Sequence, residues 1–273
     1  MEKIKSKIEE ADYFTGNKLK GDDFSIEEIK AWYEDEQEGY ANLGAKDEGN
    51  YSYGYDAINW KYGYSMISPK DSVAKVLGIG SAYGHEFFPI INKIKELHII
   101  EPSDSLMSKD LKGIKPIYHK PNINGALNFE DNSFDLITCF STLHHIPNVS
   151  FVMKEMHRCL KPNGILLIKE PINSMGDWNK PRNGLTKNER GIPVDIFRKI
   201  IKECGFSFVK ENLCLSMTAF ISKLLKRPIY KNKTYLLFDS ILSRVLQNRA
   251  TKYHRTSFIQ KIAPTSVYYF LKK

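Results

Sequence analysis

The chain has 273 residues, enough for one large domain or for a domain with a cap, and its 42% hydrophobic content is ordinary for a globular protein. No apolar run is long enough to span a bilayer, and the charged start of the chain lacks the apolar core of a signal peptide, so we expect a cytoplasmic protein. The net charge of +8 is uneven: residues 1–71 carry 9 Lys or Arg against 16 Asp or Glu, and residues 221–273 carry 12 against 1. The asymmetry indicates either a solvated basic face or an acidic partner at the C-terminal part.

The cysteine pattern argues against a disulfide framework and against a metal site. Four cysteines lie in apolar stretches without metal-like spacing: Cys139, Cys159, Cys204 and Cys214. We interpret them as reduced packing residues. No cluster of carboxylates and histidines at ligand spacing stands out either, so no metal is expected.

Residues 1–70 are predicted to form a helical cap. Ser25 and Glu28 have the spacing of a capping box, in which each side chain accepts a hydrogen bond from the backbone of the other residue. A helix is therefore expected from there to about Asn42, ending near Gly44.

A stretch rich in tyrosine follows this helix, over residues 51–64. Tyrosine rings pack against apolar groups while their hydroxyls can reach a polar ligand. Tyr53 and Tyr55 are therefore candidate substrate contacts in a lid over a bound ligand. The alternative is a helix that packs on the core.

The chain is organised around residues 73–101. An apolar run rich in β-branched side chains predicts a buried parallel strand, and Gly78, Gly80 and Gly84 follow it in a tight turn. A helix limited by Pro89 and a second apolar strand come next, and the strand ends at Glu101. Strand, glycine turn, helix, strand and acid together form a unit that holds a nucleoside, with the carboxylate accepting the ribose hydroxyls.

Alternating strands and helices continue after this unit. Short helical residues are expected at 106–111, strands at 114–118, 133–140 and 165–168, and a helix at 149–160 that a Lys-Pro-Asn-Gly turn ends at residues 161–164. Such alternation predicts an α/β fold with a mostly parallel, Rossmann-like sheet and helices on both faces.

Three stretches of this block, residues 128–137, 143–148 and 160–168, resemble in order the small-molecule branch of the class I S-adenosylmethionine-dependent methyltransferases. The resemblance covers roughly residues 73–208. It implies a seven-stranded sheet with one antiparallel strand at the edge, and residues 206–215 and 266–271 fit the last hairpin. The implied organisation is a cap at 1–70 and a methyltransferase domain at 71–273, with a basic helical insertion at about 216–264.

The resemblance also implies the cofactor, S-adenosylmethionine, and its product, S-adenosylhomocysteine. The glycine loop would lie against the methionine part, Glu101 would take the ribose hydroxyls, and further residues would surround the adenine and the methyl group. The implied cofactor-binding residues are Gly78, Gly80, Ser81, Gly84, Glu101, Pro102, Ser103, Asn124, Phe140 and Ser141. Gly78 stands where the family has an acid, and Ala82 where it has a second glycine. Because of these departures, a protein that binds the cofactor without transferring a methyl group is an alternative, while the glycine spacing disfavours a nicotinamide oxidoreductase.

Candidate catalytic residues follow the predicted strands at the ligand end of the sheet. His144 and His145 lie there, and Glu170 follows the neighbouring strand. An oxygen acceptor needs a base, and an imidazole titrates near neutral pH, so we predict His145 as the base, with Glu170 orienting the substrate or the imidazole. His144 is the competing candidate, and a structural role for the pair is the alternative.

A long polar loop follows Glu170, and long loops at the ligand end are usually functional. Its candidate substrate contacts are Asp177, Trp178, Arg182 and Arg190. A tryptophan face with nearby carboxylate and guanidinium groups suits a phosphorylated sugar, the alternative being a surface loop pinned by Trp178.

The insertion contains one clear amphipathic helix. Phe238, Ile241, Leu242, Val245 and Leu246 repeat at helical spacing, among many Lys and Arg residues. The insertion is interpreted as a helical lid packed on the sheet, with contact to a membrane surface, a lipid-linked substrate or RNA phosphates as alternatives.

Together these features predict O-methylation of a small-molecule or carrier-linked acceptor, foremost a hydroxyl of a sugar in glycan synthesis. Lipid, quinone-like or tRNA acceptors are alternatives. Nucleic acid is disfavoured because no Asn-Pro-Pro-Tyr-like tetrapeptide follows the strand at 133–140.

Overall fold

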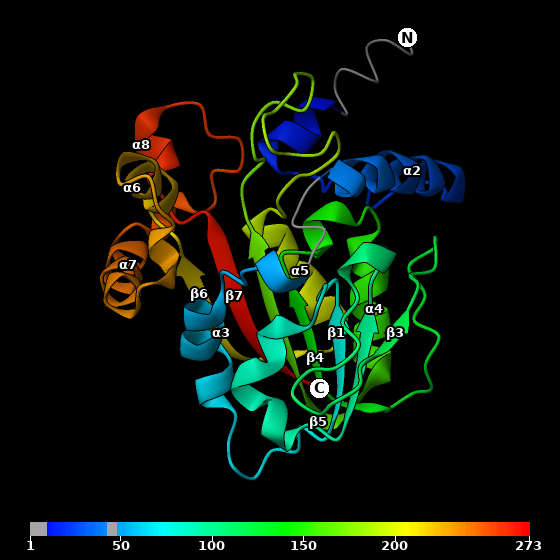
Figure 1. Cartoon of the computed structure of the whole chain (residues 1–273). Coiled ribbons are helices and arrows are strands. Elements are labelled where there is room, and N and C mark those ends of the chain that lie inside the picture. The colour runs from blue at the N-terminus through cyan, green and yellow to red at the C-terminus, as the bar shows by residue number, and fades with distance from the viewer. Residues whose placement is uncertain (1–9, 43–47) are drawn as a thin grey trace.

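The computed structural model describes residues 10–42 and 48–273 of the chain, and its centre is a seven-stranded sheet (Figure 1). The strand order is β3-β2-β1-β4-β5-β7-β6. The strands are β1 (Lys75–Ile79), β2 (Glu96–Ile100), β3 (Ile117–His119), β4 (Phe134–Phe140), β5 (Leu160–Pro171), β6 (Ser207–Cys214) and β7 (Ser266–Lys272). This is the predicted Rossmann-like architecture.

Strands β1 to β5 pair in parallel, and β7 is antiparallel to both of its neighbours. The antiparallel strand therefore lies one position in from the edge, which β6 forms, rather than at the edge as the sequence indicated. The reason is connectivity: β6 and β7 form a hairpin whose second strand pairs with β5 along the whole run from Ile165 to Pro171.

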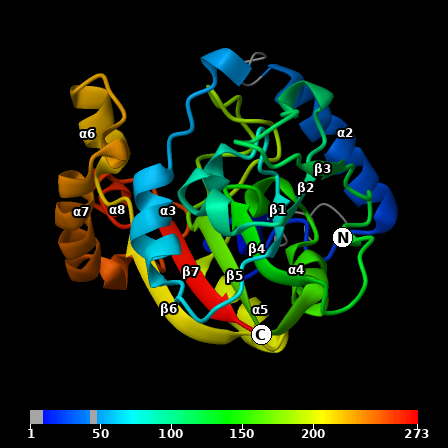
Figure 2. The same ribbon diagram turned by 60° about the horizontal axis from the view of Figure 1, so that its bottom comes forward.

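Helices cover both faces of the sheet. The α-helices are α2 (Ile26–Asn42), α3 (Asp56–Tyr62), α4 (Val149–Cys159), α5 (Val194–Glu203), α6 (Thr218–Leu224), α7 (Lys233–Val245) and α8 (Phe258–Lys261). On one face, α4 and α5 bury apolar side chains such as Met153 and Phe197; on the other, α3 and the 3₁₀ segment η3 (His85–Lys93) bury Ile58 and Phe87. Figure 2 shows the helices arranged around the sheet from a second direction.

Several predicted elements are confirmed. Helix α2 begins after Ser25 and has the expected capping box: the Ser25 amide donates to Glu28 at 2.8 Å and the Glu28 amide donates to Ser25 Oγ at 3.3 Å. Strand β4 and helix α4 lie within a residue of the expected bounds. The four cysteines are free and buried.

Other segments differ from the prediction. The helix after Gly84 is a 3₁₀ segment with Pro89 inside it, and proline lacks the amide that an α-helix needs there. Residues 106–111 form no helix; only η4 (Asp104–Leu106) is helical, and an isolated bridge joins Leu111 to Ile114. None of the helices within residues 10–42 and 48–273 has the length and apolar character needed to cross a membrane.

Candidate functional site

A cavity of about 200 Å³ opens at the carboxyl ends of the parallel strands, where ligands bind in folds of this kind. Five parts of the chain build its walls: the glycine turn after β1, the segments that follow β2, β3 and β4, and helix α2. The lining residues are Tyr33, Glu36, Ile79, Gly80, Ala82, Ile100, Glu101, Pro102, Leu106, Pro121, Ser141, Thr142, His145 and Ile146.

The turn after β1 contains small residues in left-handed backbone conformations. Gly80 has φ +65° and its amide donates to the Ile100 carbonyl at 2.9 Å. A Cβ atom there would come within 2.4 Å of the Thr142 hydroxyl oxygen, so a larger residue has no room. Ala82 also adopts a left-handed conformation, with φ +47°, at the position where the related family has glycine.

Glu101 is buried at the end of β2, on the cavity wall. Its two carboxylate oxygens accept hydrogen bonds from the amides of Ala82 at 3.1 Å and Ser103 at 3.0 Å. Burial raises the pKa of this carboxyl, and the two amide hydrogen bonds oppose that shift. The Ala82 amide thus joins the glycine turn directly to the acid.

A second carboxylate lies beneath the turn. Glu86 is buried in η3 and accepts hydrogen bonds from the hydroxyls of Ser81 at 3.1 Å and Thr138 at 2.6 Å. Burial raises its pKa to about 7, against the effect of the two hydroxyls. A Cβ at Gly78 would lie 2.2 Å from Ser81 Oγ, so the position where the family has an acid is closed, while Glu86 brings a carboxylate to the same hydroxyl.

His145 is the histidine that faces the cavity. Its Nδ1 lies 2.8 Å from Glu36 Oε2, a carboxylate from α2 that is itself held by the Thr186 hydroxyl. Burial lowers the pKa of His145 and the charge of His144 lowers it further, whereas the hydrogen bond to Glu36 works in the other direction. The imidazole is therefore neutral near pH 7 and able to accept a proton.

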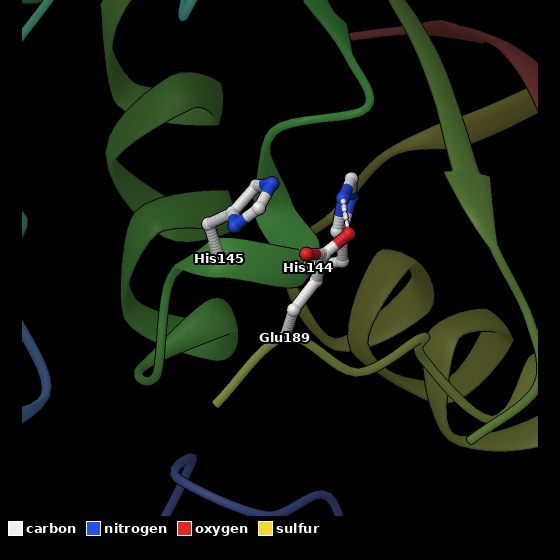
Figure 3. Close-up of side chains that lie close together, drawn as sticks. All are labelled: His144, His145 and Glu189. Atoms are coloured by element: carbon white, nitrogen blue, oxygen red, sulfur yellow. Dashed lines mark ion pairs between the residues drawn. The ribbon is translucent and has the colours of Figure 1, made fainter. Parts of the chain in front are cut away.

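His144 lies outside the cavity lining, between two carboxylates. Its Nδ1 is 2.6 Å from Glu170 and its Nε2 is 3.4 Å from Glu189. Figure 3 shows the Glu189 carboxylate against the ring of His144, with the His145 ring beside the pair. Burial alone would lower the pKa of His144, but the charges and hydrogen bonds of Glu170 and Glu189 outweigh burial and raise it.

Glu170 accepts three hydrogen bonds, from the amides of Thr142 and Leu143 as well as from His144. It therefore fixes the loop that carries both histidines, and the imidazole it orients is that of His144 rather than that of His145.

The same cluster is also a candidate cation site. His144, His145 and Glu189 each offer one ligand atom, and these atoms lie within 4.8 Å of one another. Two histidines and a carboxylate are a ligand set that zinc and other divalent cations accept. A protonated His144 between Glu170 and Glu189 is the competing state, because a metal-bound imidazole nitrogen cannot carry a proton.

The predicted cofactor residues divide into three groups. Gly80, Glu101, Pro102 and Ser141 line the cavity. Gly78, Ser81, Gly84, Ser103 and Phe140 are not among the lining residues. Asn124 is exposed, with its side chain accepting from the Ala126 amide, and Pro121 lines the cavity instead.

The predicted substrate residues do not line this cavity. Arg190 is fully buried and donates to the backbone carbonyls of Leu143, His144, Ile146, Pro147 and Lys20, and Arg182 donates to four carbonyls of its own loop. Trp178 stacks on Phe14 with ring centroids 4.3 Å apart, and Asp177 pairs with Lys180. These four side chains brace the loop.

The two candidate tyrosines pack near the cavity without entering its lining. The Tyr53 hydroxyl accepts from Asn59 at 2.6 Å. The Tyr55 ring lies 3.6 Å from the ammonium nitrogen of Lys169, which donates to the hydroxyl of the cavity residue Ser141 at 2.5 Å.

Two lining residues, Tyr33 and Glu36, were not predicted as site residues. Both come from α2, more than a hundred residues before the histidines. Only the spacing of a capping box marked that helix, and a capping box says nothing about which residues face a ligand.

Comparison with known proteins identifies the domain. Residues 77–168 match the model of a family described as a methyltransferase domain. A sterol 24-C-methyltransferase of Saccharomyces cerevisiae is 33% identical over 97 residues, 32% of this chain and 25% of that protein. A demethylmenaquinone methyltransferase of Geobacillus stearothermophilus is 33% identical over 91 residues, 33% of this chain and 35% of that protein. The matched stretches thus span about a quarter to a third of these relatives.

Solved structures share the fold at low identity. An S-adenosylmethionine-dependent methyltransferase from Mesorhizobium loti superposes with a TM-score of 0.51 at 11% identity, over 79% of this chain and 97% of that one. A phosphoethanolamine N-methyltransferase of Haemonchus contortus gives 0.51 at 18% identity, over 80% and 51%. The family match, the strand order and the glycine turn with its acid agree: residues 77–168 match a methyltransferase domain, and the chain has the fold of S-adenosylmethionine-dependent methyltransferases.

Proposed function

We propose that this protein transfers the methyl group of S-adenosylmethionine to a hydroxyl of a small-molecule or carrier-linked acceptor, with His145 as the general base. The observation that supports this most is the pairing of His145 with Glu36 on the cavity wall that also holds Gly80 and Glu101. A histidine held by a carboxylate and lacking its own charge is suited to take a proton from a hydroxyl.

The chain's own residues have distinct parts in this proposal. The cofactor supplies an activated methyl group on a sulfonium that leaves as a thioether. Glu101 would accept the ribose hydroxyls, and the backbone around Gly80 would lie against the methionine part. As the acceptor oxygen forms its bond to the methyl carbon and the carbon–sulfur bond breaks, His145 would take the acceptor proton at its imidazole and later release it to water. Glu36 would hold the ring and stabilise the transient imidazolium.

The structure bears differently on the two classes of acceptor, a sugar hydroxyl and a lipid or quinone-like hydroxyl. The sugar interpretation rested on Trp178, Arg182 and Arg190, whose polar groups donate to backbone carbonyls. A lipid, quinone-like or lipid-carrier-linked hydroxyl is better supported, because the cavity wall is largely apolar, with Ile79, Ile100, Leu106 and Ile146, and because relatives are named as sterol and quinone methyltransferases.

The test is an acceptor screen with methyl-labelled S-adenosylmethionine. Sugar nucleotides, polyprenyl-linked glycans, quinols, phospholipids and tRNA are each offered, and label is counted in each fraction, with and without EDTA. We expect label in a lipid or carrier-linked fraction, unaffected by EDTA because Glu170 and Glu189 favour the protonated form of His144 over a metal-bound one. Label in tRNA alone would contradict the proposed acceptor class. Cofactor binding without transfer to any fraction would favour a binding protein.

A further inference from the structure

Helix α7 turns its apolar side away from the protein. The residues it buries are Leu236, Asp239 and Ser243. Asp239 accepts from the Leu215 amide at 2.8 Å, and the Ser243 hydroxyl lies 2.8 Å from that of Ser216. The side chains of Ile241 and Val245 are 68% and 73% exposed. Three residues of the amphipathic stripe that the sequence predicts, Phe238, Ile241 and Val245, therefore face outward, while Leu242 and Leu246 are half-buried.

Neighbouring helices extend this apolar surface. The rings of Phe220 in α6 and Phe258 in α8 meet edge to face with centroids 5.6 Å apart. Figures 1 and 2 both show α6, α7 and α8 together at one flank of the molecule, on the side of β6. We call the exposed large apolar residues of this flank the helical face: Phe220, Leu224, Leu225, Leu237, Phe238, Ile241, Val245, Phe258 and Ile259.

This concentration is unusual for a protein surface. Of the fifteen large hydrophobic residues that are exposed in the described part of the chain, nine belong to the helical face. Scattered apolar residues are ordinary on a surface, but a contiguous group marks a site of interaction.

The segment that carries the helical face is strongly basic. Residues 216–264 contain nine exposed cations and a single acid, Asp239, which is buried. The cations are Lys223, Lys226, Arg227, Lys231, Lys233, Arg244, Arg249, Lys252 and Lys261. Within residues 10–42 and 48–273, none of the nine forms an ion pair.

We propose that the helical face is a membrane-docking surface that binds the interface of an anionic bilayer. Its apolar side chains would enter the boundary between headgroups and acyl chains, and the surrounding Lys and Arg would meet lipid phosphates. Apolar residues on one side of a helix with cations beside them are the pattern of helices that lie in the membrane interface.

The same chemistry disfavours other occupants. A second copy of this chain would bring nine cations against nine cations. In a complex with nucleic acid, the cations would contact phosphates and the aromatic rings would stack on bases. Exposed aliphatic residues such as Leu224, Ile241 and Ile259 would have no comparable partner there. An anionic bilayer satisfies both the charge and the apolar surface.

Hydrogen bonds connect the segment between α7 and α8 to a loop at the ligand end of the sheet. The Tyr253 hydroxyl donates to the Gly191 carbonyl at 2.7 Å, and His254 lies 2.8 Å from the Ser174 hydroxyl. Both partners belong to the loop that carries Glu189. If the proposed function holds, a bilayer would therefore present an acceptor near the loop that supports the histidines, but docking itself does not depend on methyl transfer.

Vesicle co-sedimentation with the full chain tests the proposal. Vesicles of phosphatidylcholine alone are compared with vesicles containing phosphatidylglycerol, at low and at physiological salt. Two triple variants separate the apolar and the electrostatic contributions to vesicle binding. The first, Leu237→Ser/Ile241→Ser/Val245→Ser, removes exposed apolar groups. The second, Lys226→Gln/Arg227→Gln/Lys233→Gln, removes positive charge. Ile26→Ser/Ile123→Ser removes two exposed apolar residues elsewhere and is the matched control. Thermal melting and cofactor binding report that each variant is folded.

We expect at least tenfold tighter binding to the anionic vesicles, weakened by salt, and at least a tenfold loss in each triple variant but not in the control. Equal binding by the apolar triple variant and the wild type would overturn the proposal. So would a concentration-dependent dimer that the apolar variant abolishes without vesicle binding, or binding of RNA without binding of vesicles. Failure of methyl transfer with docking intact would count against the proposed function alone.

Discussion

Two adjacent histidines in this site have pKa values that move in opposite directions. The rings of His144 and His145 are 4.1 Å apart between centroids. His144 lies between Glu170 and Glu189 and its pKa is raised, whereas burial and the charge of His144 lower the pKa of His145. Environments that separate two titrating groups in this way assign one to hold charge and the other to accept a proton.

Replacing His145 tests that assignment. A base must be deprotonated to act, so activity is present above its pKa and is lost as the pH falls through it. Because the pKa of His145 lies below 6.5, we expect a plateau through neutral pH and an acidic limb below pH 6.5. His145→Asn should lower kcat by about a hundredfold or more and remove that limb. Glu36→Gln should lower kcat less and keep the limb, because the imidazole remains. An unchanged kcat and limb in His145→Asn would contradict the role.

The left-handed conformation of Ala82 gives a second test at single-residue scale. Glycine adopts φ +47° without the steric cost that a Cβ brings, although it also raises the entropy of the unfolded chain. We expect Ala82→Gly to leave the free energy of unfolding unchanged or higher, measured by urea titration. Ala219→Gly, at an exposed position in α6, should cost about 0.5–1 kcal/mol. An equal loss in both variants would show that Ala82 is not strained.

At the scale of elements, one buried arginine joins the histidine loop to the cap. Arg190 donates to Leu143, His144, Ile146 and Pro147 carbonyls beyond β4 and to the Lys20 carbonyl. Its guanidinium carbon lies 5.1 Å from the centroid of the Trp32 ring. The loop is thus held in place by a side chain that the sequence pattern assigned to substrate.

Loss of this clamp should be severe. Arg190→Met removes the side-chain donor of the Ile146 and Lys20 carbonyls, whereas the Leu143, His144 and Pro147 carbonyls keep a backbone donor. Each buried carbonyl left without a donor costs about 1–3 kcal/mol, so we expect the free energy of unfolding to fall by at least about 2 kcal/mol. Arg198→Met removes a half-exposed guanidinium paired with Glu211 and Asp195 and should cost less than about 1 kcal/mol. Urea denaturation of both variants measures the difference. Similar losses would show that Arg190 is not a clamp.

Local patterns predicted the elements better than their contacts. The glycine turn and Glu101 were predictable because the unit is continuous in sequence and the residue types of each part indicate its conformation. The periodicity of α7 gave its apolar stripe, but periodicity does not say which side of a helix meets the protein. Here Asp239 and Ser243 find partners at Leu215 and Ser216, and those hydrogen bonds set the orientation.

At the scale of the whole molecule, the site is assembled from distant segments. Glu36 comes from the cap, His145 from the turn after β4, and Glu189 from the loop before α5. No sequence spacing relates these positions, so the pairing of Glu36 with His145 could not be predicted. The contacts of the loop residues Trp178 and Arg182 could not be predicted for the same reason, because composition identified polar groups but not their partners.

The central claim is that the cavity holds S-adenosylmethionine with Glu101 on its ribose, and calorimetry tests it most directly. The wild type should bind S-adenosylmethionine or S-adenosylhomocysteine, and Glu101→Ala should bind at least about tenfold more weakly, since hydrogen bonds to a charged group contribute roughly 1.5–3 kcal/mol. Glu96→Ala, at the opposite end of β2 and paired with Lys75 on the surface, is the control and should bind as the wild type does. Binding of NADH without binding of S-adenosylmethionine, or equal affinity in Glu101→Ala and the wild type, would contradict the account.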